Sequence, residues 1–186
     1  MQKKTTMNVC KKYNVFPFKC CVWFVSIVSN KRYFEWGAGQ STLIASTVAM
    51  SVTSIENGKT YYDSYKARIP KNVTFKYINT GNTHGLGYPD HKDRSISYVN
   101  AIKNENVDVV LIDGRYRVAC ATSTFMFTNA TYVFIHDYTN RHWFHEIETI
   151  YDMVMSLDTL ALFKRRPNIS LETLQILYKK YIFNPS

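Results

Sequence analysis

The sequence contains little glycine, proline or cysteine, and it has no long hydrophobic run. Of 186 residues only 7 are glycine, 5 are proline and 4 are cysteine. Cys10, Cys20, Cys21 and Cys120 show no paired CxxC spacing, which argues against a zinc site and against a disulfide framework. The cysteines therefore predict reduced thiols and a cytoplasmic protein.

The most apolar run covers residues 20–28, far short of the roughly 20 residues that span a membrane. Basic residues precede this run, as in a signal sequence. However, Asn30-Lys31-Arg32 follows where a cleavage site would need small residues. We therefore interpret the run as a buried helix and expect no membrane span.

The composition predicts one folded domain. Hydrophobic residues make up 46% and aromatic residues 15% of the chain, which is typical of a globular protein. We expect a single domain over residues 1–186, with residues 1–14 as a flexible basic arm. The net charge of +9 suits an anionic partner such as nucleic acid, a membrane surface or a phosphorylated substrate. Scattered lysines that only keep the protein in solution are the alternative.

Strands alternate with helices along the chain. This order predicts an α/β three-layer sandwich with a mostly parallel, Rossmann-like sheet of about six or seven strands. We expect strands at residues 32–35, 51–55, 73–79, 107–112, 132–135 and 159–163, and helices at residues 18–29, 41–50, 60–69, 96–103, 117–127 and 141–155. Residues 80–94 read as a long loop, and residues 174–182 as a strand or a helix. The apolar segment 107–112 is expected at the buried centre of the sheet.

Polar residues follow the predicted parallel strands. They are Glu35, Glu56, Asn79, Asp113 and the pair His136-Asp137. The carboxyl ends of parallel strands meet at one edge of a sheet, and ligands bind there in open α/β folds. The sequence therefore predicts an active-site rim at this edge.

The first of these strands runs into a glycine loop, Gly37-Ala38-Gly39. Glu56 lies 19 residues after Gly37, a spacing that suits an acid that binds ribose hydroxyls. No phosphate-binding lysine follows the loop, and Thr42 stands where a dinucleotide fingerprint has its third glycine. This pattern favours a ligand with a ribose but without a pyrophosphate, and S-adenosylmethionine fits that description.

Four segments resemble the class I S-adenosylmethionine-dependent methyltransferases, over roughly residues 30–165. YFEWGAGQST resembles the first motif of that family, and SVTSIEN its acidic second-strand end. VDVVLIDGRYRVACA resembles its fourth-strand motif, and YVFIHDYTNR the segment that ends its fifth strand. The combination of IDGRYRVACA with a later HDY is similar to a group of small methyltransferase-like proteins.

The resemblance implies roles for individual residues. The residues that would hold the methionine part of the cofactor are Glu35, Gly37, Ala38 and Gly39. Glu56 would bind the ribose hydroxyls, Asn57 would lie near the adenine, and Asp113 would face both cofactor and acceptor. Trp36 departs from the family pattern, because many relatives carry a small residue there.

Two mechanisms remain open for the catalytic candidates Asp113, His136 and Asp137. A hydroxyl group with a pKa far above 7 needs a base or a metal ion before it accepts a methyl group. Several sugar and catechol O-methyltransferases hold a divalent metal at the two corresponding strand ends, and oxygen ligands suit Mg²⁺. Histidine stands at position 136 where an acid would complete such a site, so His136 as general base is an equal alternative.

Structural roles are also open for the same residues and their neighbours. His136 and Asp137 could cap a helix. Arg115 and Arg117 could bind an anionic acceptor or pair with Glu35 or Asp113. His84, Tyr88 and His91 could form a substrate lid. A plain surface loop is an equal alternative. We expect His142 and His145 to lie on an ordinary helix face.

The sequence thus favours an O-methyltransferase that acts on a sugar, as part of a glycan or free, or on another small hydroxylated acceptor. A nucleic-acid methyltransferase is an alternative that the positive charge invites. Base-amino methyltransferases usually carry N/D-P-P-Y/F at the fourth strand end, where this chain has Asp113-Gly114-Arg115-Tyr116. A catalytically silent S-adenosylmethionine-binding module is the third hypothesis, although the glycines and acids that such a module loses are present.

Overall fold

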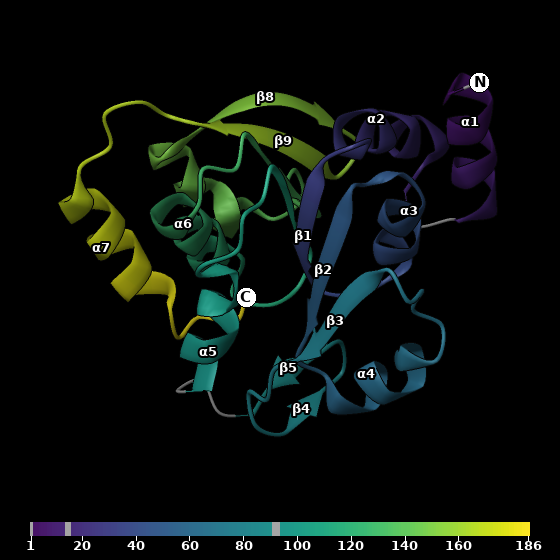
Figure 1. The fold of residues 1–186 in the computed structure, drawn as a ribbon. Coiled ribbons are helices and arrows are strands. Elements are labelled where there is room, and N and C mark those ends of the chain that lie inside the picture. Colours follow the sequence, from purple (N-terminus) through teal and green to yellow (C-terminus); the bar gives the residue numbers. More distant parts are fainter. Residues whose placement is uncertain (1, 14–15, 91–93) are drawn as a thin grey trace.

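A seven-stranded, mostly parallel sheet forms the centre of the protein (Figure 1). The structure is a computed structural model, and it describes residues 2–13, 16–90 and 94–186. The strands stand in the order β3-β2-β1-β6-β7-β9-β8. They are β1 Arg32–Trp36, β2 Ser51–Glu56, β3 Val73–Tyr77, β6 Val109–Ile112, β7 Tyr132–Ile135, β8 Tyr151–Leu157 and β9 Leu160–Arg165. The pairs among β3, β2, β1, β6 and β7 are parallel, whereas β9 runs antiparallel to both β7 and β8. The predicted α/β fold with a mostly parallel sheet is confirmed.

Helices cover both faces of the sheet (Figure 1). On one face Val109 and Leu111 of β6 join a core with α1 Gln2–Lys12, α2 Phe18–Val28 and α3 Gln40–Val48. On the other face Val110 and Ile112 join a core with α5 Ser95–Val99, η2 Asn100–Ile102, α6 Arg117–Phe127, η3 His142–Thr149 and α7 Leu171–Tyr181. Every residue of β6 is buried, as expected for a strand covered on both sides. The prediction of a central, buried strand is confirmed.

The amino-terminal segment corrects two predictions. Residues 2–12 form helix α1, so the expected flexible arm is wrong there, and residues 1 and 14 lie outside the described residues. Val9 and Cys10 are buried in the same core as α2. Cys10 forms a disulfide bond with Cys21 of α2, so the prediction of reduced thiols is wrong for this pair. The sequence spacing did not reveal this bond because the pairing depends on how α1 packs against α2.

The carboxyl-terminal third differs from the predicted pattern. Residues 141–155 were expected to form one helix, but they divide into the 3₁₀ helix η3 and the edge strand β8. Met153 and Val154 of β8 are exposed, so this strand lacks the clean alternation that marks a half-buried strand. The last element is the helix α7, and the hydroxyl of its N-cap Ser170 accepts a hydrogen bond from the amide of Thr173 at 3.0 Å.

Two smaller features lie near β2 and β3. Helix α4 Lys59–Lys66 contacts both strands. The predicted loop of residues 80–94 contains a short hairpin of β4 Thr83–His84 and β5 Tyr88–Pro89. Among the described residues, no helix is both long and apolar enough to pass through a bilayer.

Candidate functional site

A cavity of about 540 Å³ opens where the parallel strands end, within the size range of about 300–1,000 Å³ of small-molecule sites. Strand pairing aligns Trp36 with Ile112 and Ile112 with Ile135, so the loops after β1, β6 and β7 begin side by side. The lining residues are Gly37, Ala38, Gly39, Ser41, Glu56, Asn57, Gly58, Thr60, Tyr61, Thr83, Gly85, Leu86, Gly87, Asp113, Gly114, Arg115, Arg117, His136, Asp137 and Arg141. The structure thus brings together the predicted cofactor and catalytic residues except Glu35, while Asn79, which was also predicted at this rim, does not line the cavity.

The loop after β1 passes very close to the loop after β6. Gly37 has a φ of +88°, and a Cβ atom there would lie 2.7 Å from the Gly114 nitrogen. Only glycine fits such a contact without a backbone shift. A Cβ atom on Gly39 would lie 3.9 Å from the Tyr61 hydroxyl, an ordinary van der Waals contact, and Gly39 lines the cavity. Gly37 therefore shapes the loop, whereas Gly39 leaves room for a ligand.

Glu35 lies inside the protein and does not line the cavity. Its carboxylate accepts hydrogen bonds from the hydroxyls of Tyr33, Ser41, Thr42 and Ser54. Burial raises the pKa of Glu35 to about 7, although these four donors act in the opposite direction. The expectation of a direct cofactor contact is therefore corrected: Glu35 ties the start of α3 to β1 and β2.

Glu56 and Asn57 form the wall of the cavity at the end of β2. The amide groups of Asn57 and Gly58 donate to Oε1 of Glu56 at 2.8 and 2.7 Å, which fixes the carboxylate. Burial raises the pKa of Glu56, and the backbone donors oppose that rise. The Asn57 side-chain amide donates to the Thr80 hydroxyl and to the Gly87 carbonyl, both at 2.9 Å. Asn57 therefore joins the end of β2 to the hairpin loop above the cavity.

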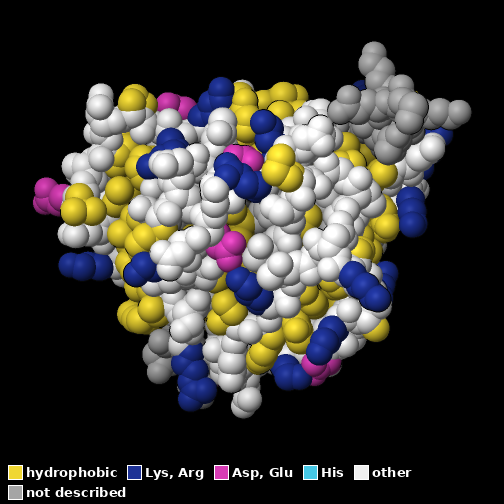
Figure 2. Space-filling model, viewed as in Figure 1, with side chains coloured by type: hydrophobic (Ala, Val, Ile, Leu, Met, Phe, Trp, Pro, Cys, Tyr) yellow, Lys and Arg dark blue, Asp and Glu magenta, His cyan; other side chains and the backbone are white. Residues whose placement is uncertain are grey.

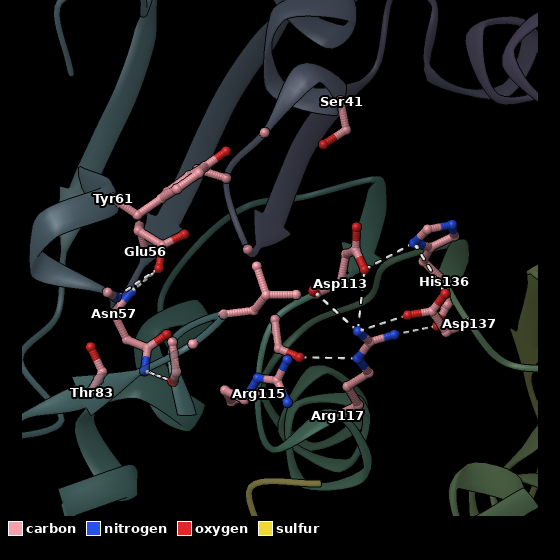
Figure 3. A pocket seen from close by; sticks show the side chains of 18 of the residues that line it. Ser41, Glu56, Asn57, Tyr61, Thr83, Asp113, Arg115, Arg117, His136 and Asp137 are labelled. Carbon is pink, nitrogen blue, oxygen red and sulfur yellow. Dashed lines mark hydrogen bonds and ion pairs between the residues drawn. The ribbon is translucent and has the colours of Figure 1, made fainter. Parts of the chain in front are cut away.

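Asp113 and His136 meet at the opposite end of the cavity (Figure 3). Nδ1 of His136 lies 3.0 Å from Oδ1 of Asp113, and the Phe16 ring packs edge-on against the imidazole. Burial lowers the pKa of His136, but the hydrogen bond to Asp113 and the charges of Asp113 and Asp137 outweigh burial, so the pKa is raised overall. This pair has the geometry of a histidine base oriented by a carboxylate.

Two arginines hold Asp137 and the adjacent backbone. The buried Arg117 guanidinium lies 3.3 Å from Oδ1 of Asp113 and 3.4 Å from Oδ2 of Asp137, and it donates to the carbonyl groups of Gly114 and His136. Arg141 contacts Oδ2 of Asp137 at 2.9 Å. Asp137 itself has a left-handed φ of 53°, a conformation that aspartate tolerates better than most residues. These contacts answer the question that the sequence left open for Arg117, which pairs with the site carboxylates.

Asp113, His136 and Asp137 also have the spacing of a metal site, since one ligand atom from each lies within 4.8 Å of the others. However, both carboxylates are already paired with guanidinium groups. A divalent cation bound there would lie next to the positive charges of Arg117 and Arg141 and would be repelled by them. The donor set therefore fits a neutral or anionic acceptor better than it fits Mg²⁺.

Several cavity residues were not singled out from the sequence. Tyr61 of α4 stacks on Tyr65, and Thr83 and Leu86 come from the hairpin region. Arg141 could have been found, because an arginine four residues after a site aspartate suggests an ion pair. Two predicted lid candidates can be placed: exposed His84 pairs with Asp90 at 2.9 Å, and Tyr88 stacks on Arg115. His91 lies outside the described residues.

His142 and His145 lie on η3 rather than on the predicted α-helix, and neither lines the cavity. Nε2 of His145 lies 3.2 Å from the Tyr138 carbonyl. The structure thus agrees with the expectation that His142 and His145 lie on an ordinary helix face and not in the site.

No protein-family model and no curated protein sequence matches the chain. Several solved structures, however, match the fold of this chain. A methyltransferase-like protein from Silicibacter pomeroyi has a TM-score of 0.77 and 24% sequence identity, over 92% of this chain and 97% of that one. A protein from Thermoplasma acidophilum has a TM-score of 0.56 and 10% identity, over 90% of this chain and 98% of that one. The chain therefore has the Rossmann-like α/β fold of a methyltransferase-like protein.

Proposed function

We propose that the protein is an S-adenosylmethionine-dependent methyltransferase. The observation that carries the proposal is one cavity with a fixed carboxylate at its β2 wall and a carboxylate–histidine pair at its other end. The Silicibacter pomeroyi protein of the same fold is described as methyltransferase-like, which supports this proposal.

The residues of the cavity fit the cofactor. Gly39 lines the cavity without a side chain, so a ligand can approach its backbone closely. The Glu56 carboxylate accepts hydrogen bonds only, and this suits the two hydroxyl donors of a ribose. Asn57 stands beside it, at the place where the adenine would lie. Bound there, S-adenosylmethionine would supply a methyl group on a positively charged sulfur.

We further propose O-methylation of a small hydroxylated acceptor such as a sugar. His136 would accept the proton of the acceptor hydroxyl, and Asp113 would orient the imidazole and stabilise its charged form. Arg117 fixes Asp113 and the carbonyl of His136 at the same time, so it holds this pair together. Arg141 and Arg117 neutralise Asp137, which leaves His136 as the proton acceptor.

A nucleic-acid acceptor has less support. Lysine and arginine side chains lie scattered over the face seen in Figure 2 and do not form a continuous basic patch there. A nucleic-acid-binding face usually gathers such side chains along one groove or stripe.

The test is methyl transfer from isotope-labelled S-adenosylmethionine to a panel of sugars and small hydroxylated compounds, with an unmethylated oligonucleotide included. Label on a small acceptor, lost in His136→Ala, is the expected result. Label on the oligonucleotide alone would assign the nucleic-acid alternative. Cofactor binding without transfer to any acceptor would favour a silent binding module.

A further inference from the structure

Arg115 lines the same cavity but differs from the other two arginines. Arg117 and Arg141 are paired with site carboxylates, whereas no described carboxylate lies within ion-pair distance of Arg115. Its Nε atom is buried and has no hydrogen-bond partner among the described residues. An arginine that lines a cavity and forms no ion pair with a described carboxylate is available for an anionic ligand.

The Arg115 guanidinium is held in place without being neutralised. Its Cζ atom lies 5.2 Å from the centre of the Tyr88 ring, in the hairpin strand β5. Stacking on an aromatic ring fixes the plane of a guanidinium and leaves the N–H groups at its edge free to donate. Figure 3 shows Arg115 between the Glu56–Asn57 group and the Asp113–Arg117 group. The terminal N–H groups of Arg115, a residue that lines the cavity, are therefore available to a ligand.

We infer that Arg115 binds an anionic group, a carboxylate or a phosphate, of the methyl acceptor. This inference rests on the proposed methyltransferase function and names the acceptor class: a small hydroxylated compound with an acidic group. A planar guanidinium binds either anion through paired N–H donors. S-adenosylmethionine also carries a carboxylate, so affinity of Arg115→Gln for S-adenosylhomocysteine distinguishes an acceptor anion from the cofactor carboxylate.

The position of Arg115 allows one acceptor molecule to place its anion at Arg115 and its hydroxyl near His136. Arg115 follows Asp113 by two residues, with Gly114 between them, and both side chains line the cavity with His136. An acceptor whose anion binds Arg115 therefore has its hydroxyl groups in the cavity that also contains the proposed base. Arg115 would then select the acceptor, while His136 would activate it.

The experiment is an NMR titration that follows the Arg115 Nε–H signal, assigned by its absence in Arg115→Gln. The probes are inorganic phosphate and acetate, added to protein with and without S-adenosylhomocysteine. We expect a saturable shift of this signal. The probe that binds more tightly indicates whether the site prefers a phosphate or a carboxylate. The amide signals of Gly85 and Gly87 report anion binding in both proteins. In Arg115→Gln this affinity should fall at least about tenfold, as expected for a lost charge-assisted contact.

Arg68→Gln is the matched control. It removes the same charge from an arginine that also stacks on a tyrosine, with Cζ 4.8 Å from the Tyr65 ring centre, but lies outside the cavity. This variant should bind the anion as the parent does. The inference is overturned if neither probe shifts the Arg115 signal, or if both variants bind equally well.

Affinity for S-adenosylhomocysteine separates the two proposals. We expect Arg115→Gln to bind it like the parent. An equal loss of S-adenosylhomocysteine binding would make Arg115 a cofactor residue and overturn the acceptor assignment. If the parent itself does not bind S-adenosylhomocysteine, the proposed function fails, and the phosphate and acetate titrations still report whether Arg115 forms an anion site.

Discussion

Nδ1 of His136 lies 3.0 Å from Oδ1 of Asp113, although the two residues follow different strands of the sheet. The contact exists because β6 and β7 are parallel neighbours and end in register at Ile112 and Ile135. A hydrogen bond through Nδ1 leaves Nε2 as the nitrogen that can accept a proton. This relationship leads to a prediction for the dependence of activity on pH.

Asp113→Asn should move the pH profile of methyl transfer. The Asp113 carboxylate helps to raise the pKa of His136, so its loss should lower that pKa. A base acts in its neutral form, and the parent rate should therefore rise as pH increases through the raised pKa. In Asp113→Asn this rise should occur at lower pH, and the plateau should fall by about 10²-fold. Rate profiles of the two proteins between pH 5 and 9 check this, and an unmoved profile would assign Asp113 a structural role only.

Chelation should not stop the reaction. The guanidinium groups of Arg117 and Arg141 already neutralise the carboxylates that a metal ion would need. Turnover in EDTA should therefore equal turnover with Mg²⁺. His136→Ala should lower kcat by about 10²-fold or more, while His142→Ala, an exposed histidine on η3, serves as control. Loss of turnover in EDTA, together with an inactive Asp137→Asn, would establish a metal mechanism instead.

Glu35 should make stability depend on pH. Its folded-state pKa of about 7 lies above the ordinary value of 4.5, so the folded protein holds this proton more tightly than the unfolded chain. The parent should therefore lose stability as pH rises from about 4.5 to about 7. Glu35→Gln removes this ionisation. Across this pH range the difference in free energy of unfolding between Glu35→Gln and the parent should therefore shift by about 3 kcal/mol in favour of the variant.

Denaturant unfolding at pH 5 and pH 8 measures this difference. Glu172→Gln, at an exposed position of α7, is the control and should differ from the parent by the same amount at both pH values. A pH-independent difference for Glu35→Gln would show that the four hydroxyl donors keep Glu35 ionised.

Substitution of Gly37 should lower stability, whereas substitution of Gly39 should lower ligand binding. Gly37→Ala places a Cβ atom within 2.8 Å of the Asp113 backbone at a φ of +88°, so it should lower the melting temperature. In Gly39→Val the Cβ atom meets only an ordinary contact with Tyr61, so this variant should melt close to the parent but lose S-adenosylhomocysteine binding because its side chain occupies the cavity wall. Thermal unfolding and a ligand titration of both variants check this. Equal destabilisation would contradict the division of roles between the two glycines.

The parallel half of the sheet could be predicted from the sequence because its strands are short segments rich in β-branched and aromatic residues that alternate with helical segments. The central strand β6, a continuous apolar run, is buried along its whole length. The edge strand β8 could not be predicted in this way, because its one partner strand among the described residues is β9 and it exposes Met153 and Val154. The bond between Cys10 and Cys21 depends on helix packing, which residue spacing does not encode.

The site was predictable in its location but not in its side-chain directions. Parallel strand ends meet at one edge, so Glu56, Asp113 and His136 could be expected together. Whether a side chain at a strand end points into the core or into the cavity depends on the pleat and the twist. The family resemblance implies a cofactor contact for Glu35, but the structure buries its side chain, and the sequence alone does not distinguish Arg115 from Arg117.

The most direct test of the central claim is a calorimetric titration of the protein and of Glu56→Ala with S-adenosylhomocysteine. The account predicts binding to the parent at one site, and weaker binding to Glu56→Ala by about 5- to 150-fold because charge-assisted hydrogen bonds to the ribose are lost. Absence of binding to the parent, or equal binding to both proteins, would contradict the assignment of this cavity to S-adenosylmethionine.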